Sequence, residues 1–207
     1  MIFNTWFQSA QPPFQPRSKA VVPETALFRS KHGHMIATRV VAPSDFGMIA
    51  ELLAGLSAQS LFLRYCMPMQ RMAPEMVARE AARLGQTNST RQLTVVALDG
   101  VSGADRVIGV AEFVRDAANP AAAEIALVVA DAYQRAGVGS ALIAHLLAAA
   151  RRRGISTLHA TALAENTAVR RMIARIAEPH TAETRQGMTT IQLDLRSSDQ
   201  VGGAALA

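Results

Sequence analysis

Two glycines two positions apart separate an apolar segment from a helical one, in the run Asp131-Ala132-Tyr133-Gln134-Arg135-Ala136-Gly137-Val138-Gly139-Ser140. Residues 125–130 before it are apolar, and residues 141–153 after it have helical spacing. A strand, a glycine turn and a helix in this order leave backbone N–H groups open at a helix N-terminus. Glycine allows close approach to the backbone, and the helix dipole favours negative charge. The chemistry predicted here is binding of a phosphate or pyrophosphate.

Three known phosphate loops can be compared with this run. A P-loop needs Gly-Lys-Ser/Thr at its end, but Gly139 is followed by Ser140 and Ala141. A dinucleotide fingerprint needs a third glycine or alanine where Leu142 stands. The third pattern, Gln/Arg-x-x-Gly-x-Gly/Ala, is met in full by Gln134, Gly137 and Gly139. The run therefore resembles the acetyl-CoA pyrophosphate loop of the GNAT N-acetyltransferase superfamily. The alternative is a glycine-rich connection without a ligand.

The elements around the loop follow from hydrophobic spacing and turn residues. Helical spacing after the cap Pro43-Ser44-Asp45 predicts a helix. Three apolar runs, 93–98, 106–114 and 122–130, are separated by residues typical of turns, so they predict an antiparallel meander of three strands. We expect strands over 34–41, 93–98, 106–114, 122–130, 155–161, 181–185 and 188–195, and further helices over 57–65, 74–84, 141–153 and 166–176. The strand after the long helix is expected to be parallel to the one before it.

This order resembles the GNAT fold over residues 34–195. The implied fold class is α+β (α/β): a mixed, mostly antiparallel central sheet of about six to seven strands flanked by helices. Residues 1–33, with four prolines, are expected to be an extended arm, and residues 196–207 a disordered tail. Three segments resemble the catalytic domain of bacterial protein-lysine acetyltransferases: Ser60-Leu61-Phe62-Leu63-Arg64-Tyr65, Ala123-Glu124-Ile125-Ala126-Leu127-Val128-Val129 and Glu165-Asn166.

The resemblance implies direct acetyl transfer from acetyl-CoA to a primary amine, with protein lysine slightly preferred over a small-molecule amine. A lysine amine has a pKa near 10.4, so a general base helps, directly or through water. Glu124 is the first candidate for that base, because it lies in an apolar strand where burial would raise its pKa, and the family places its catalytic glutamate there. Glu112 is the second candidate. Either side chain can instead be a solvated or ion-paired glutamate.

The resemblance also implies the residues that hold the cofactor. A backbone N–H near Val128 or Val129 would stabilise the oxyanion, and Asn166 would contact the pantetheine arm, although asparagine is also a favoured helix N-cap. The pyrophosphate would bind to the loop itself, Gln134, Arg135, Ala136, Gly137, Val138, Gly139 and Ser140.

One departure from the family concerns the acid that protonates the leaving thiolate. The tyrosine often found seven residues after the asparagine is Ile173 here. Solvent, Tyr133 or Tyr65 would have to take that role. The alternative function is therefore a non-catalytic acyl-CoA-binding sensor or interaction domain with the GNAT fold.

Composition sets the remaining expectations. A net charge of +5 suits an acidic ligand such as CoA, whereas 5% aromatic residues leave few platforms for nucleic-acid bases. The chain has no apolar stretch long enough to span a membrane, no signal-peptide pattern in residues 1–20 and a single cysteine, Cys66, so we expect a cytoplasmic protein. The histidines form no metal-ligand pattern, so no metal is expected. Packing of the N-terminal arm on a second copy of the chain would give a homodimer, which the sequence neither requires nor excludes.

Overall fold

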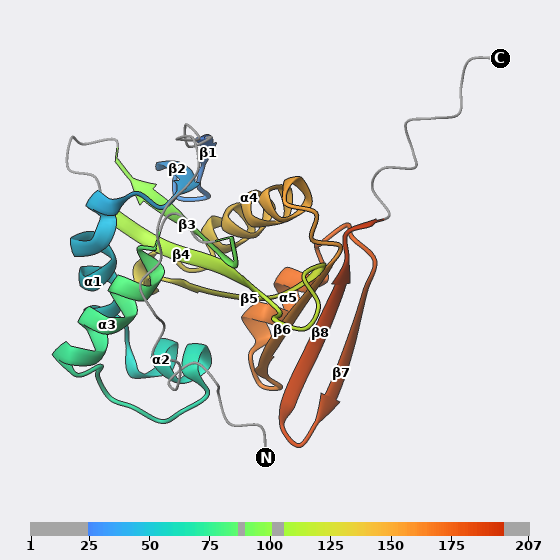
Figure 1. Cartoon of the computed structure of the whole chain (residues 1–207). Helices are drawn as coiled ribbons and strands as arrows, with labels where there is room; N and C mark the ends of the chain where they lie inside the picture. Colours follow the sequence, from blue (N-terminus) through green and yellow to red (C-terminus); the bar gives the residue numbers. More distant parts are fainter. Residues whose placement is uncertain (1–24, 87–89, 101–105, 197–207) are drawn as a thin grey trace.

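The computed structural model describes residues 25–86, 90–100 and 106–196. An eight-stranded sheet forms its centre, in the order β1-β2-β3-β4-β5-β6-β8-β7 (Figure 1). Every neighbouring pair of strands is antiparallel except β5 and β6, which are parallel. The strands are β1 Ala26–Arg29, β2 Met35–Val40, β3 Gln92–Asp99, β4 Arg106–Arg115, β5 Ala122–Val129, β6 Thr157–Leu163, β7 His180–Arg185 and β8 Met188–Asp194.

The helices form two groups, one on each face of the sheet (Figure 1). Their ends carry the expected signals: Ser57 caps α2 by accepting from Ser60 N–H, and Pro74 opens α3. On one face lie α1 Phe46–Ala54, α2 Ala58–Tyr65 and α3 Pro74–Leu84, and on the other lie α4 Val138–Arg152 and α5 Thr167–Ile173.

The hydrophobic core has two halves, divided by the sheet. Phe113, Leu142 and Leu146 are fully buried in the half beneath α4 and α5. Leu53 and Leu61 are buried in the half beneath α1, α2 and α3. Because successive side chains of a strand point to opposite faces, β4 and β5 contribute to both halves.

The predicted fold class is confirmed, with one strand more than expected. Residues 26–29 pair with β2 as an edge strand, although they fall in the segment 1–33 predicted to be an extended arm. A four-residue strand is too short to show an alternating pattern, which is why the sequence did not reveal it. Residues 1–24 and 197–207, which hold most of the predicted arm and tail, lie outside the described residues.

Two boundaries near the site also differ from expectation. Strand β6 begins at Thr157 instead of residue 155, because Ile155 N–H still donates to Ala150 O (3.0 Å) at the end of α4. Helix α5 ends at Ile173 instead of residue 176, where it tightens into a turn with Ile176 N–H donating to Ile173 O (2.9 Å).

Among the described residues, no single helix is long and apolar enough to cross a bilayer. Only the segments Pro43–Ala54 and Ala58–Tyr65 taken together pass by length and composition, and they are bent by 111° relative to each other.

Candidate active site

Strands β5 and β6 separate part-way along their length. They pair only over Ala122–Glu124 and Thr157–His159. Beyond this point β5 continues to Val129 against β4, and β6 continues to Leu163 against β8. The two strands therefore diverge after Glu124 and His159, and residues 125–129 form an edge of β5 that no longer pairs with β6. We call residues 125–129 the open edge.

The direction of the backbone groups along the open edge follows from the register of β4 and β5. Ala130 N–H donates to Ile108 O (2.9 Å), and Val129 lies opposite Gly109. Because the backbone groups of successive residues point to alternate sides of a strand, Val128 directs its N–H toward β4, whereas Val129 directs its N–H away from β4. Of the two residues predicted to supply an oxyanion donor, Val129 has the suitable direction.

The glycine loop connects the end of β5 to α4. A short 3-10 turn, Asp131–Tyr133, follows β5, Arg135 has a positive φ of 60°, and Gly137 caps α4 with a φ of 96°. Left-handed conformations of this kind turn the chain sharply and favour glycine. The first N–H groups of α4 have no acceptor inside the helix, so they are available to an anion. Ala136 and Val138 are buried in the core, whereas Arg135 and Ser140 are exposed.

Gly139 is not required by its own backbone conformation. It is the second residue of α4 and has no positive φ. A Cβ at this position would lie 3.5 Å from Leu127 Cδ1 and 3.8 Å from Met172 Sδ, which are ordinary van der Waals distances. The missing side chain therefore leaves space where β5, α4 and α5 meet, so a ligand can approach the backbone closely.

The beginning of the loop is tied to helix α2 by side chains. The Asp131 carboxylate accepts from Ser57 N–H (3.0 Å), Ser57 Oγ (2.5 Å) and Ser60 Oγ (2.8 Å). Gln134 Nε2 donates to Ser60 Oγ (2.9 Å) and to Val129 O (3.2 Å). The Gln134 side chain thus holds the loop against β5 and α2, and its predicted contact with the cofactor stays a prediction.

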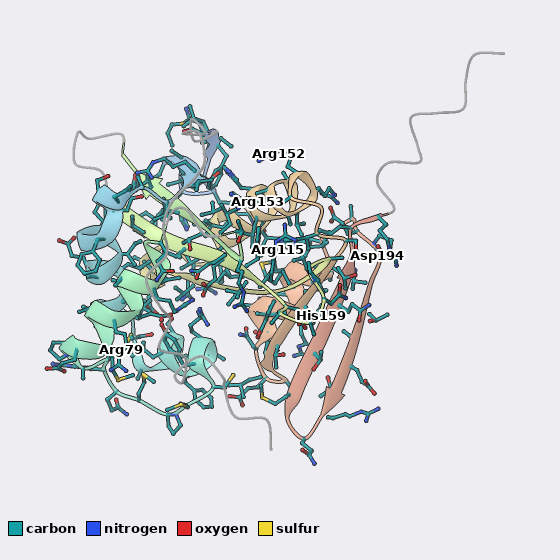
Figure 2. All side chains as sticks on the ribbon, in the orientation of Figure 1. Arg79, Arg115, Arg152, Arg153, His159 and Asp194 are labelled. Carbon is teal, nitrogen blue, oxygen red and sulfur yellow. The ribbon has the colours of Figure 1, made fainter. Side chains whose placement is uncertain are left out.

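Glu124 lies at the point where β5 and β6 diverge. It is opposite Val114 on β4 and His159 on β6, the latter labelled in Figure 2. Its side chain is exposed and points to the face of the sheet that carries α1, α2 and α3. Partial desolvation raises the pKa of the Glu124 carboxyl; Arg64 opposes the rise, Glu112 adds to it and His159 opposes it. A reachable carboxylate with a raised pKa has the properties of a general base.

Glu112, the second candidate for the general base, is part of a buried ion-pair cluster. Glu112 is only 1% exposed. Arg83 donates to both of its oxygens (2.7 Å each), Arg64 Nη2 donates to Oε1 (2.9 Å), and Gln92 Nε2 donates to Oε2 (3.3 Å). Glu80 completes the cluster by accepting from Arg83. Both carboxylate oxygens of Glu112 are thus already engaged by arginine donors, which gives this side chain a structural role in the cluster.

Asn166 and Ile173 lie at the two ends of α5, whereas Tyr65 ends α2 and Tyr133 lies in the turn after β5. Asn166 is buried and its Oδ1 accepts from Val169 N–H (3.1 Å), so it serves as the N-cap of α5. Ile173 is buried in the core beneath α4 and α5. Tyr133 donates to Asp99 Oδ2 (2.5 Å) and Tyr65 donates to Glu80 Oε1 (3.4 Å). Burial raises the pKa of Tyr65. Neither tyrosine stands on the open edge.

A groove of about 300 Å³ runs between α4 and α5 from the end of the glycine loop. Ser140 lines one end, and the Arg151–Glu178 ion pair (2.5 Å) and Arg175 line the other. Its middle is apolar and includes Leu147 and Met172. Among the described residues, no group of three or more histidine, cysteine, aspartate or glutamate side chains is placed to hold a metal ion.

Known families and structures were compared with this arrangement. The sequence profile of the Acetyltransferase (GNAT) family matches residues 62–177, which contain the open edge, the glycine loop and Asn166. The chain belongs to the GNAT acetyltransferase family. Within this family it is 34% identical over 95 residues to acetyltransferase Pat of Mycolicibacterium smegmatis. That match covers 46% of this chain and 28% of Pat, so the chain spans well under half the length of this relative.

Solved structures of GNAT proteins share the fold. The GNAT domain of PAT from S. lividans superposes with a TM-score of 0.70 at 22% identity, covering 82% of this chain and 96% of that one. The putative acetyltransferase yncA from Salmonella typhimurium, whose structure contains its cofactor acetyl-CoA, has a TM-score of 0.56 at 20% identity, covering 79% of this chain and 96% of that one. The chain is thus similar in sequence to part of Pat and similar in fold to the GNAT domain of PAT.

Two features near the site were not anticipated from the sequence. The first is the pairing of Arg64 and Arg83 with Glu112, from which they are 48 and 29 residues distant in the chain. The second is His159, which the sequence showed only as an isolated histidine and which the register of β5 and β6 places beside Glu124. Parallel pairing of the strands before and after α4 was expected, so the position of His159 could have been derived from a correct register.

Proposed function

We propose that this GNAT protein transfers the acetyl group of acetyl-CoA directly to a primary amine, with Glu124 as the general base. The observation that carries the proposal is the position of Glu124 at the divergence of β5 and β6, on the same strand that ends at the glycine loop. Transfer from a thioester to an amine needs a proton acceptor for the amine and a site for the phosphates of the donor. Glu124 and the N-terminus of α4 offer these two groups.

The residues around the loop fit CoA. The N–H groups of the first turn of α4 would hold the pyrophosphate, Arg135 would add a positive charge, and the space left by Gly139 would admit the ligand close to the backbone. The α4–α5 groove, with Arg175 at one end, has room for the nucleotide half. When bound, acetyl-CoA supplies the activated acetyl thioester.

The chemistry balances with groups that the chain provides. An ammonium acceptor loses a proton to Glu124, directly or through water, and the free amine attacks the thioester carbon. The C–N bond forms, the attacking nitrogen loses its second proton to solvent, and the C–S bond breaks, while the backbone N–H of Val129 is directed to stabilise the oxyanion. The thiolate leaves and takes a proton from solvent, because Ile173 stands where relatives often have a tyrosine.

A protein lysine is the preferred acceptor in this proposal. Register places Glu124, His159 and Gln192 in a row across β5, β6 and β8. Gln192 in this row and Thr161, two residues further along β6, are both exposed. The acceptor side is therefore an open polar surface, which suits a lysine carried by a folded protein. The resemblance of residues 60–65 and 123–129 to bacterial protein-lysine acetyltransferases favours the same acceptor.

The test is thiol release from acetyl-CoA in the presence of lysine-containing proteins and of a panel of small amines, with acetylation located by mass spectrometry. Acceptor-dependent thiol release, greater with proteins, is expected. If the protein binds acetyl-CoA but transfers to no acceptor, the catalytic proposal fails.

A non-catalytic acyl-CoA sensor or interaction domain is the second candidate function. The observation in its favour is the burial of Ile173 at the position where a thiolate acid is often found. Calorimetric binding of CoA without any turnover would support this second candidate.

A further inference from the structure

The turn of the hairpin formed by β1 and β2 lies against the glycine loop. Lys31 N–H donates to Ala136 O at 3.1 Å, across a separation of 105 residues. The hairpin, residues 26–40, is outside the range 62–177 that matches the family. An element beyond the matched region therefore contacts the loop that we assign to CoA.

Two side-chain contacts accompany this hydrogen bond. The ring of Phe28 approaches Gly137, where its Cε2 would lie 4.0 Å from an added Cβ. The ring of His34 meets the Tyr133 ring edge-on, with centroids 6.1 Å apart. Tyr133 is in turn hydrogen-bonded to Asp99 at the end of β3. The hairpin thus contacts the loop at three places, Tyr133, Ala136 and Gly137.

The peptide between Ala136 and Gly137 is the part of the loop that these contacts fix. In a trans peptide the C=O and N–H point in opposite directions. Because Ala136 O is directed at Lys31, the N–H of Gly137, the N-cap residue of α4, is directed away from the hairpin. Without the Lys31 contact this peptide could rotate, since glycine accepts most backbone conformations.

We propose that the β1–β2 hairpin is a positioning element that holds the Ala136–Gly137 peptide in the orientation that binds the pyrophosphate of CoA. This inference rests on the proposed function, since it assumes that the loop binds CoA. Lys31 acts through its backbone N–H, and its role is to lower the conformational cost of binding by ordering the loop in advance.

The geometry of the hairpin turn allows this hydrogen bond to be removed selectively. Gly33 N–H donates to Ser30 O (3.0 Å), Ser30 N–H donates to His34 O (2.8 Å), and Gly33 has a φ of 85°. Lys31 and His32 are not among the residues with positive φ. These features define a type I turn followed by a left-handed glycine, in which Lys31 occupies the position that favours proline.

The experiment compares Lys31→Pro with Lys31→Ala. Both remove the ammonium, but only Lys31→Pro removes the N–H donor, so the difference between the two variants isolates the hydrogen bond. We expect the Kd for CoA, measured by calorimetry, to be about fivefold higher in Lys31→Pro than in Lys31→Ala, the effect of one hydrogen bond. The kcat at saturating acetyl-CoA should be the same in both, since the reacting groups are untouched.

Equal Kd values in two folded variants would overturn the inference and leave the proposed function intact. A second measurement covers the case in which Lys31→Pro does not fold. In the unsubstituted protein, CoA should slow hydrogen exchange of the Lys31 amide, because a ligand that binds the ordered loop also favours the hairpin contact. Unchanged exchange on CoA binding would overturn the inference. Absence of any CoA binding would overturn both the inference and the proposed function.

Discussion

Glu124 and His159 are the last pair of residues that join β5 to β6, and the two strands diverge immediately after them. This pairing places a carboxylate whose pKa is raised by desolvation at the start of the open edge. The same strand continues to Val129 and leads through the glycine loop to α4, which begins at Val138. Strand β5 and the loop after it therefore connect the proposed general base to the proposed CoA site.

The raised pKa of Glu124 predicts the shape of the pH–rate profile. A glutamate ordinarily titrates near 4.3, and desolvation moves this carboxyl upward. Because the base must be ionised, kcat/KM for the amine should rise about tenfold per pH unit below the Glu124 pKa and level off above it. The profile is measured by thiol release between about pH 3.5 and about pH 9, a range that includes the ordinary glutamate pKa. An acid limb at or below about 4.3 would show that another group controls the rate.

Glu112 should affect stability and not proton transfer. Removing one member of a buried ion-pair cluster typically costs about 3–5 kcal/mol. We therefore expect Glu112→Gln to lower the free energy of unfolding by roughly 3 kcal/mol, while the acid limb of the pH–rate profile is kept. Denaturant unfolding and the pH profile measure the two quantities.

Glu183→Gln is the matched control for that variant. The Glu183 side chain is 65% exposed and forms an ion pair with Arg185 on the surface. Such surface pairs contribute less than about 1 kcal/mol, so its loss should be small. A Glu112→Gln protein as stable as Glu183→Gln, but without the acid limb, would restore Glu112 as a candidate base.

Gly139→Ala should change stability and ligand affinity in opposite directions. Alanine in a helix is favoured over glycine by about 0.5–1 kcal/mol, and the added Cβ meets no close contact. The variant should therefore be slightly more stable. The Cβ occupies the space assigned to the ligand, so the Kd for CoA should rise by about tenfold, or about 1.4 kcal/mol.

Gly137→Ala provides the contrast, since its φ of 96° is strained for any residue with a side chain. This variant should lose about 1–2 kcal/mol of stability. Thermal unfolding and calorimetry with CoA measure both variants. Unchanged CoA affinity in Gly139→Ala would place the ligand elsewhere on the protein.

The parts of the structure that local signals encode could be predicted. Helix α3 begins at Pro74 and ends at Leu84 as expected, because a proline start and a following glycine mark its ends. The strand, loop and helix around Gly137 were also predicted, because a glycine pair between periodic segments is a local pattern. The position of Glu124 on its strand follows from the same pattern.

Long-range pairing accounts for what the sequence did not show. Glu112 and Glu124 are both glutamates in apolar strands, and only the tertiary structure gives Glu112 two buried arginine partners. Gln134 matches the loop pattern, but its amide is bound to Ser60, 74 residues away. Strand β1 is stabilised by pairing with β2 and by the hydrogen bond between the turn that follows it and the glycine loop. Neither contact can be predicted from a four-residue segment.

The central claim is that Glu124 takes the proton from the amine, and Glu124→Gln tests it most directly. We measure thiol release from acetyl-CoA with a lysine-containing protein across pH, with Glu183→Gln as the control. The account predicts that Glu124→Gln lowers kcat/KM by about 10²–10⁴-fold, abolishes the acid limb and leaves CoA binding in place. A Glu124→Gln protein that keeps the rate and the pH profile of the control would contradict it.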